Sequence, residues 1–185
     1  MKLFLSIIIS FITLGFFIIL IISTIDREGS QGRPGLNEVS GTAEVKFEVF
    51  NKIYENNIYG DEISYDEYDA IVLDFWASWC PPCIQEAETL AKGYRDWKNK
   101  NVKFIGVALW DNEKSIKNFV EKYGFQYDVF IDNDGKYAIE YGVKALPEKF
   151  FINNKGKIVK KYIGPINEIE LKNLIEETVK NNELP

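Results

Sequence analysis

The sequence lacks histidine altogether and has only two cysteines and one methionine among its 185 residues. A structural zinc site takes four ligands, commonly from two Cys-x-x-Cys or Cys/His pairs, so this composition nearly excludes one. A c-type haem attachment site needs a histidine directly after the second cysteine, where this chain has Ile84. Because both cysteines lie in one short motif, no other disulfide can hold the fold. We therefore expect no metal, no cofactor and a fold held by its core.

The sequence also lacks an excess of basic residues, with 22 Lys and Arg against 28 Asp and Glu and a formal net charge of −6. This balance gives no indication of a nucleic-acid partner. Hydrophobic residues make up 46% of the chain and aromatic residues 15%, which is enough for a bulky core. The length suits one domain of about 150 residues with a tail, and there is no internal repeat.

The N-terminal stretch Leu3–Ile25 contains no charged residue. As a helix it would be about 34 Å long, enough to cross a hydrocarbon core of about 30 Å. A cleaved signal peptide, the alternative, has a shorter apolar core and a small-residue cleavage site. We favour an uncleaved transmembrane signal-anchor at residues 1–25. Residues 26–42, rich in Gly, Ser, Pro and charge, are predicted to be a flexible tether to a domain at 43–185.

The residues that can carry chemistry gather at Trp79-Cys80-Pro81-Pro82-Cys83. The preceding run, Ala70–Trp76, is short, β-branched and aromatic, which predicts a buried strand. After it, apolar residues recur at helical spacing: Ile84, Ala87, Ala91, Tyr94 and Trp97. Proline is favoured at the first helical position. The pattern therefore places the two cysteines at the N-terminus of a helix.

A helix N-terminus carries a partial positive charge and free N–H groups, so we expect it to lower the pKa of the Cys80 thiol and make Cys80 the nucleophile. Cys83 lies one turn further on, within disulfide reach, and can resolve a mixed disulfide. The alternative, an inert structural disulfide, closes so short a loop that it would constrain the unfolded chain little. The redox interpretation requires the Cys80 thiol to have a lowered pKa and to be open to solvent.

Other periodicities predict an α/β fold with a central sheet covered on both faces. Strands are expected near Val45–Val49, Glu62–Tyr65, Ala70–Trp76, Val102–Leu109, Tyr127–Ile131, Lys149–Ile152 and Lys157–Tyr162. Helices are expected after Cys80, after Asp111 or Asn112 as the cap, at Tyr137–Tyr141, and over the stripe Leu171, Leu174, Ile175 and Val179. The lysines at 155, 157, 160 and 161 are interpreted as the solvated face of the last hairpin rather than a basic patch.

Asp74 is a lone carboxyl group inside the apolar strand. Burial of its charged form is costly, so its pKa should rise. A carboxyl with a raised pKa, six residues before Cys80, could take the proton from Cys83 during resolution. The alternative is that Asp74 faces a solvated gap and has no role.

The motif Phe-Trp-Ala-Ser-Trp-Cys-Pro-Pro-Cys and the later Tyr-Gly-Val-Lys-Ala-Leu-Pro-Glu-Lys-Phe-Phe-Ile resemble the thioredoxin superfamily. With the anchor and tether, they resemble its TlpA/ResA/CcmG (DsbE) group of membrane-tethered thiol-disulfide oxidoreductases. The resemblance covers about Val45–Lys180 and implies a thioredoxin-like fold, a central mixed β-sheet flanked by helices. The chain departs from the group at Glu88, where a proline is common, and around Ala145–Leu146, where a glycine is common.

The resemblance implies roles for individual residues. Cys80 and Cys83 match the attacking and resolving cysteines, which form the redox disulfide. Asp74 matches the buried acid of thioredoxin, and Glu86 matches a glutamate near the active site. Glu86 could equally be an acid placed for the helix dipole. The expected substrate-binding residues are Trp79, Pro81, Pro82, Leu146, Pro147 and Glu148, with Pro147 matching a cis-proline that faces the cysteines; an ordinary trans proline is the alternative.

These observations predict an extracytoplasmic, single-pass protein of the inner membrane, because an exchangeable cysteine pair suits an exported domain. Lys2 supports a cytoplasmic N-terminus, although Arg27 and Arg33 weaken that signal. The expected function is reduction of disulfides in exported proteins. The resemblance implies apocytochrome c as the leading client and a membrane thiol-disulfide protein as electron donor. The alternatives are a thiol peroxidase or disulfide-donating oxidase on the same fold, and a non-enzymatic chaperone-like binding module.

Overall fold

The computed structural model describes residues 4, 13–18, 40–43, 45, 49–65 and 67–183. Its contacts divide the chain into two units, Met1–Gln31 and Gly32–Pro185. In the first unit, Phe4 and residues 13–18 are helical. Most of the predicted span at 1–25 and most of the predicted tether at 26–42 lie outside the described residues. Among the residues that are described, no helix is long and apolar enough to cross a membrane.

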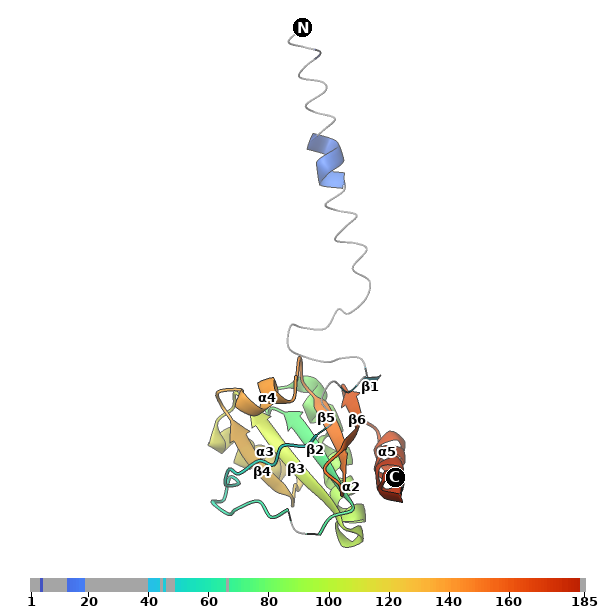
Figure 1. Ribbon diagram of the computed structural model, residues 1–185. Helices are drawn as coiled ribbons and strands as arrows, with labels where there is room; N and C mark the ends of the chain where they lie inside the picture. Colours follow the sequence, from blue (N-terminus) through green and yellow to red (C-terminus); the bar gives the residue numbers. More distant parts are fainter. Residues whose placement is uncertain are drawn as a thin grey trace. The chain divides into compact units, whose positions relative to one another are not determined.

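In the described part of the second unit, the strands form one sheet in the order β1-β6-β5-β2-β3-β4 (Figure 1). Their bounds are β1 Gly41–Ala43, β2 Ala70–Trp76, β3 Val102–Leu109, β4 Asp128–Asp132, β5 Glu148–Asn153 and β6 Ile158–Ile163. The pairs β2–β3 and β3–β4 are parallel, whereas β2–β5, β5–β6 and β1–β6 are antiparallel. The sheet is therefore mixed, as predicted.

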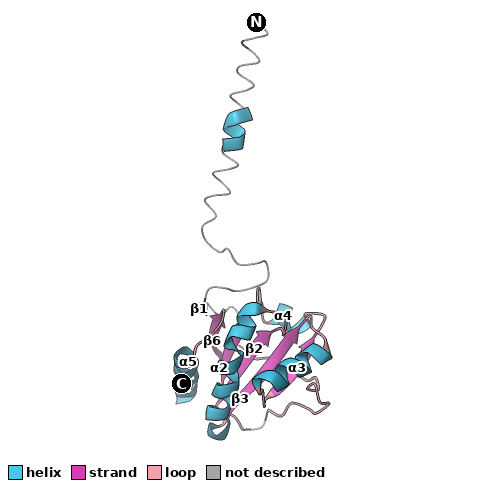
Figure 2. Ribbon diagram, turned by 180° about the vertical axis from the view of Figure 1, so that it is seen from behind, coloured by secondary structure: helices cyan, strands magenta, loops and turns pink. Residues whose placement is uncertain are grey.

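The helices are α2 Pro81–Trp97, α3 Glu113–Tyr123, α4 Lys136–Glu140 and α5 Glu168–Lys180, with 3-10 turns η1 Lys98–Lys100 and η2 Asn181–Glu183. Helices α2 and α3 lie on one face of the sheet (Figure 2), and α4 lies on the other (Figure 1). The segment 49–65 joins α4 on that second face, where the Phe50 ring packs against Tyr141 at 6.4 Å. Helix α5 packs against α2 and β5.

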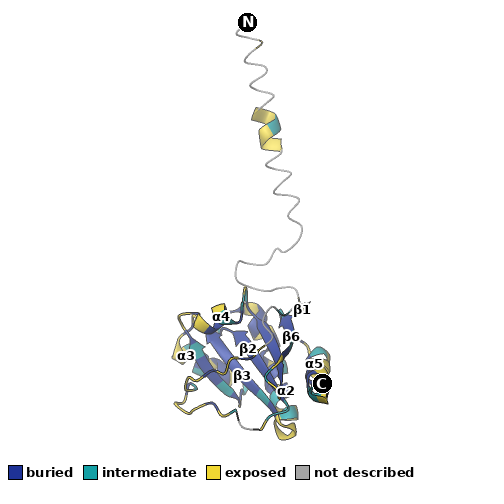
Figure 3. Ribbon diagram, viewed as in Figure 1, coloured by how far each residue is buried: buried dark blue, intermediate teal, exposed yellow. Residues whose placement is uncertain are grey.

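Strand β2 is central, and all seven of its residues are buried (Figure 3). Successive side chains of a strand point to opposite faces. Phe75 packs on Tyr141 and Phe150 on the α4 side, at ring separations of 5.4 and 5.7 Å. Trp76 packs on Phe119 of α3 at 4.6 Å, on the other side. Asp74, two residues before Trp76, therefore lies on the face covered by α2 and α3.

The helix ends follow the sequence signals closely. Helix α3 begins after Asn112, whose side chain accepts a hydrogen bond from the Ser115 N–H, so Asn112 and not Asp111 is the cap. It ends at Gly124 in the left-handed conformation, φ 69°. The expected helix near Tyr137 is α4, and the expected last hairpin and last helix are present.

Before residue 70, the strand predicted near Glu62–Tyr65 is wrong, and the one predicted near Val45–Val49 lies partly outside the described residues. Val45 is not in a strand, Phe47 lies outside the described residues, and Val49 makes only a single bridge to Lys157. At the second position, Glu62 makes one bridge to Asn56. The backbone of this segment bonds instead to side chains and loops: the Tyr65 hydroxyl bonds both the N–H and the carbonyl of Ile53. The short strand β1, on the other hand, was not predicted and overlaps the end of the predicted tether.

Candidate active site

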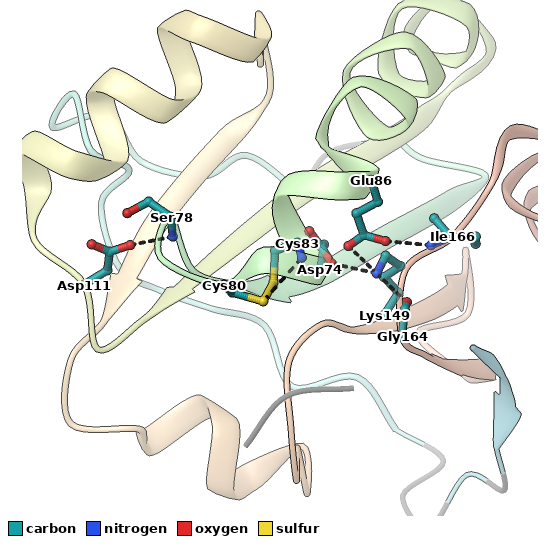
Figure 4. The surroundings of a disulfide bond; sticks show 9 residues. All are labelled: Asp74, Ser78, Cys80, Cys83, Glu86, Asp111, Lys149, Gly164 and Ile166. Atoms are coloured by element: carbon teal, nitrogen blue, oxygen red, sulfur yellow. Dashed lines mark hydrogen bonds and ion pairs between the residues drawn. A yellow bond between two sulfur atoms is a disulfide. The ribbon is translucent and has the colours of Figure 1, made fainter. Parts of the chain in front are cut away.

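Cys80 and Cys83 form a disulfide at the N-terminus of α2, with their Cα atoms 5.3 Å apart. Cys80 is the N-cap of the helix, and Pro81 is the first helical residue. The Cys83 backbone N–H donates a hydrogen bond to Cys80 Sγ at 3.3 Å (Figure 4). A helix-terminal N–H directed at this sulfur is the kind of contact that stabilises a thiolate.

The expectation that Cys80 is open to solvent is wrong for the disulfide form described here. Cys80 is 0% exposed and Cys83 is 2% exposed. The flanking residues Trp79 and Pro81 are exposed, so the rim of the site is accessible although the sulfur-bearing residues are not. Cys80 is less exposed than Pro81 because the side chain of an N-cap residue points back over the first turn of the helix. There the Cys83 N–H donates to Cys80 Sγ. Exchange at Cys80 therefore requires its covering groups to move.

The turn before Cys80 is held by the loop between β3 and α3. The Ser78 N–H donates to Asp111 Oδ2 at 2.7 Å, and the Asn112 N–H donates to Asp111 Oδ1 at 2.8 Å. Asp111 is 8% exposed. Predicted only as a possible cap, it instead fixes the chain two residues before the nucleophile.

Two indole side chains lie at the same end of the sheet. Trp79 Nε1 donates to the Trp110 carbonyl at 3.2 Å. Trp110 has a left-handed backbone, φ 47°, which is unusual for so bulky a residue. Trp79 is 49% exposed and Trp110 is 60% exposed. The sequence indicated Trp79 as a binding residue but gave no reason to select Trp110.

The Leu146–Pro147 peptide bond is cis, as the resemblance implied. Glu148 pairs with Phe75 in the antiparallel register of β2 and β5, so Pro147 lies at the end of the sheet that carries the disulfide. Leu146 is buried, and the Gly164 N–H donates to the Pro147 carbonyl at 2.9 Å. The cis-proline is thus tied to the loop that follows β6.

Glu148 is buried, not exposed, and forms an ion pair with Lys161 at 2.5 Å. Its other oxygen accepts hydrogen bonds from the N–H groups of Lys144 and Ala145. Lys161 Nζ also donates to the Gly142 carbonyl at 3.1 Å. Glu148 therefore holds the loop before Pro147 in place. The prediction that Lys161 belongs to a solvated face is wrong, because this loop covers it.

On the opposite face of the sheet, Lys149 lies between Asp74 and Glu86 (Figure 4). Lys149 Nζ is 2.6 Å from Glu86 Oε1 and 3.5 Å from Asp74 Oδ1. It also donates to the Gly164 carbonyl at 3.2 Å, while Glu86 Oε2 accepts from the Ile166 N–H at 2.7 Å. Asp74 and Lys149 are direct cross-strand partners, which explains why they meet. Glu86 comes from α2, three residues after Cys83 and on its buried face.

Burial raises the pKa of both carboxyl groups, and the Lys149 ammonium opposes this effect without cancelling it. The pKa of Glu86 rises from 4.5 to about 8. The expectation of a raised Asp74 pKa is borne out in direction. The alternatives for both residues are wrong. Asp74 is buried and does not face a solvated gap, and Glu86 lies beyond the first turn of α2, where the helix dipole would favour an acid.

The predicted site residues thus fall into a disulfide with its rim, a cis-proline loop, and two buried ion clusters on opposite faces of the sheet. Sequence reasoning missed the lysine partners of both clusters. A signal was present: Glu148-Lys149 opens an apolar strand, just as Asp74 interrupts one. Two isolated charges of opposite sign in neighbouring buried strands favour a pair.

A mixed sheet with a Cys-x-x-Cys disulfide at a helix N-terminus, and a cis-proline at the same end, defines a thioredoxin-like α/β protein. The solution structure of a candidate thioredoxin from Neisseria meningitidis has the same fold, with a TM-score of 0.67 and 26% identity over 75% of this chain and 94% of that one. The chain belongs to the AhpC/TSA family, which residues 44–161 match.

Individual relatives are thiol-disulfide oxidoreductases by name. ResA of Bacillus subtilis (strain 168) is 34% identical over 98 residues, covering 53% of this chain and 55% of ResA, so the match spans little more than half of that relative. Sporulation thiol-disulfide oxidoreductase A of the same strain is 32% identical over 124 residues, 65% of this chain and 75% of the relative. The crystal structure of StoA from Bacillus subtilis has a TM-score of 0.57 and 27% identity, covering 76% of this chain and 98% of StoA.

Proposed function

We propose that this protein is a thiol-disulfide oxidoreductase that acts through Cys80 and Cys83. One observation supports it most: the two cysteines form a disulfide across the first turn of α2, with a helix N–H on Cys80 Sγ. The names of its relatives agree with this activity. The cis-proline offers a backbone edge beside the disulfide, where an extended client segment can pair.

The chemistry follows from the two sulfurs. In the reduced protein, the Cys80 thiolate attacks a client disulfide, forms a mixed disulfide and releases one client thiolate, which takes up a proton. Cys83 then loses its proton and attacks Cys80 Sγ, which restores the protein disulfide and releases the second client thiolate. The client gains two electrons from the protein and two protons, one lost by Cys83 and one taken from solvent, where Cys80 released it on ionising. A dithiol donor returns the protein to its reduced form by the reverse exchange.

We assign the direction as reduction of disulfides in exported proteins. Pro81 has no N–H to offer the Cys80 thiolate, and neither Pro81 nor Pro82 has a positive side chain, so the reduced form gains only moderate stabilisation. The uncharged stretch Leu3–Ile25 supports a single-pass anchor in the inner membrane, with the domain on the extracytoplasmic side. Apocytochrome c, expected from the resemblance, is the leading client, and a membrane thiol-disulfide protein is the expected electron donor.

The test is mixed-disulfide trapping in cells. Cys83→Ala leaves the first exchange intact and removes the resolving thiol, so clients should stay attached and run as adducts on non-reducing gels. Cys80→Ser is the matched control and should give none. If Cys83→Ala captures no protein, or if the reduced native protein fails to react with an alkylating reagent at Cys80, the exchange function is wrong.

The same preparations separate the rival functions. Turnover of peroxide by the purified protein would favour a thiol peroxidase, and net formation of client disulfides would favour a disulfide-donating oxidase. A binding activity that survives Cys80→Ser unchanged would favour a chaperone-like module without redox chemistry.

A further inference from the structure

Trp110 is a bulky aromatic residue that is exposed although its backbone is strained. Its φ is 47°, in the left-handed region that favours glycine and, among other residues, Asn and Asp. Burial of the indole does not account for this strain, because Trp110 is 60% exposed. Residues held in such conformations cluster at active sites and ligand-binding sites, where the surrounding structure maintains the strain.

Three neighbouring segments hold Trp110 in this conformation. Trp79 Nε1 donates to the Trp110 carbonyl at 3.2 Å, and the Trp110 N–H donates to the Asp132 carbonyl at 3.5 Å. A Cβ built on Gly135 would lie 3.5 Å from Cζ2 and Nε1 of the indole, so the ring rests against the turn between β4 and α4. The indole is therefore both exposed and fixed, and a fixed side chain loses little conformational entropy when a partner binds to it.

Trp110 and Pro147 lie on opposite sides of the disulfide. Strand β2 leads into the disulfide, and its two neighbours in the sheet are β5 and β3. Pro147 directly precedes β5, and Trp110 directly follows β3. Because β2 is antiparallel to β5 and parallel to β3, both residues lie at the end of the sheet where β2 ends. A client segment that extends from Pro147 across the disulfide is therefore directed toward Trp110.

The spacing of the strands indicates which client residue meets the indole. Neighbouring strands lie about 4.8 Å apart and an extended chain advances about 3.3 Å per residue, so Trp110 is reached within about two residues of the client cysteine. The exposed residues next to the disulfide, Trp79, Pro81 and Ile84, carry no charge. A charged client side chain would lose hydration there without gaining a partner, whereas an aromatic or aliphatic one would bury apolar area.

We infer that Trp110 is a specificity-determining residue: its indole binds an apolar, preferably aromatic, client side chain close to the client cysteine, on the side directed away from Pro147. This inference rests on the proposed function and names the chemistry of the client segment that the disulfide accepts. The occupant is the client itself, because a chain joined to Cys80 in the mixed disulfide passes this rim. The strained backbone keeps the ring beside the disulfide instead of in the core.

The test compares peptide substrates that differ at a single position. Each peptide cysteine is joined by a disulfide to a fluorescent thiol, and a residue close to that cysteine, on either side, is Phe, Leu, Ser or Asp. The reduced full-length protein, in detergent, is mixed with each peptide, and the second-order rate constant for release of the fluorescent thiol is measured. We expect the wild type to react about tenfold faster with the Phe peptide than with the Ser peptide, which is what one aromatic pair contributes.

Variants at one position assign the preference to the indole. Trp110→Asn removes the ring and introduces a residue that adopts the left-handed conformation more readily, so the protein should still fold. This variant should react with the Phe and Ser peptides at similar rates, whereas Trp110→Phe keeps an aromatic ring and should keep the preference.

Tyr59→Asn is the matched control and should retain the wild-type preference. Tyr59 is also an exposed aromatic residue, at 64%. It lies at the opposite end of the sheet from the disulfide, because the N–H of the preceding Ile58 donates to the carbonyl of Val129 near the start of β4.

The possible results separate this inference from the proposed function. A wild type that reacts with all the peptides at equal rates overturns the inference and leaves the proposed function standing. A preference for Phe that survives in Trp110→Asn overturns it as well. A wild type that reduces none of the peptides overturns the proposed function, and the inference with it.

A second measurement does not depend on how Trp110→Asn folds. Cys83→Ala would be joined to the Phe peptide or the Ser peptide as a mixed disulfide. The indole N–H NMR signal of Trp110, assigned by its absence from Trp110→Phe, should shift further in the Phe adduct than in the Ser adduct. The signal of Trp97, at the other end of α2, should be the same in both. A Trp110 signal that is the same in the two adducts overturns the inference.

Discussion

At the scale of single residues, the β5–β6 hairpin carries two buried lysines, one on each face of the sheet. Lys149 is the cross-strand partner of Asp74, whereas Lys161 is the partner of Phe150 and so points to the opposite face. Each neutralises a buried acid that would otherwise be an isolated charge. One pair lies beneath the disulfide helix, and the other fixes the loop before the cis-proline.

Lys161→Met should destabilise the domain by about 3 to 5 kcal/mol, because it leaves the buried Glu148 carboxyl group without its ion-pair partner. Urea unfolding of the oxidised protein measures this change. Lys160→Met is the matched control: Lys160 pairs with Glu177 at the surface, with side chains 36% and 51% exposed, so its loss should change stability by less than about 1 kcal/mol. Equal effects of the two substitutions would contradict the assignment of Glu148 and Lys161 as a buried pair.

Glu86 should make the stability of the oxidised protein depend on pH. Its pKa is about 8 in the folded state against 4.5 as the reference, so the folded state binds the proton more tightly than the unfolded state. This contribution to stability is fully present below about pH 4.5 and is lost as pH rises to about 8. Glu86→Gln should flatten that part of the profile, measured by urea unfolding at successive pH values.

The exposed Glu88, two residues further along α2, provides the control. Glu88→Gln should leave the slope between pH 4.5 and pH 8 as it is in the wild type. A slope that survives in Glu86→Gln would show that another group carries the linked proton.

At the scale of elements, the close packing of α2 against α5 requires a glycine at one position of α2. Gly93 is buried inside α2, and a Cβ built there would lie 2.5 Å from Leu171 Cδ2 of α5. Glycine lowers intrinsic helix stability by about 1 kcal/mol relative to alanine, so its presence in the middle of this helix looks unfavourable from the sequence alone. The close approach of the two helices supplies the reason for it.

Gly93→Ala should therefore destabilise the protein by about 1 to 3 kcal/mol despite its better helix propensity, because the added methyl group overpacks the helix contact. Thermal unfolding followed by circular dichroism measures the change. Gly93→Ala combined with Leu171→Ala should be more stable than the sum of the two single changes predicts. Strict additivity would contradict direct contact between the added methyl group and Leu171.

At the scale of the whole molecule, the redox potential combines the helix terminus with its surroundings. The Cys83 N–H donates a hydrogen bond to Cys80 Sγ, and the prolines between the cysteines add no charge. We expect a potential more negative than about −180 mV, the level of protein disulfide isomerase. Equilibration with glutathione redox buffers measures it, and a value near −120 mV, typical of a strong oxidant, would reverse the assigned direction.

The predicted anchor is also a property of the whole chain. The full-length protein should remain with membranes after an alkaline carbonate wash, whereas a variant that begins at residue 38 should be released with its disulfide site intact. Release of the full-length protein by the wash would contradict the anchor without touching the chemistry of Cys80.

The sequence by itself determined the alternation of strands and helices from residue 70 onward, a helix start at Asp111 or Asn112, and the placement of both cysteines at a helix start. Those features depend on local periodicity and on residues whose backbone preferences are strong. It did not determine the region before residue 70, where Tyr65 and neighbouring loops take over the backbone hydrogen bonds.

Only the tertiary structure decided the surroundings of the disulfide. Which charges are buried together depends on strand register: Lys149 reaches Asp74 because β2 and β5 are neighbours in the sheet, although the two residues lie far apart along the chain. The burial of Cys80, the glycine that α5 requires in α2, and the carboxylate of Asp111 on the turn before the disulfide are likewise contacts between distant segments. Local sequence sets the backbone conformation of each segment, and packing sets the solvent exposure and charge of its side chains.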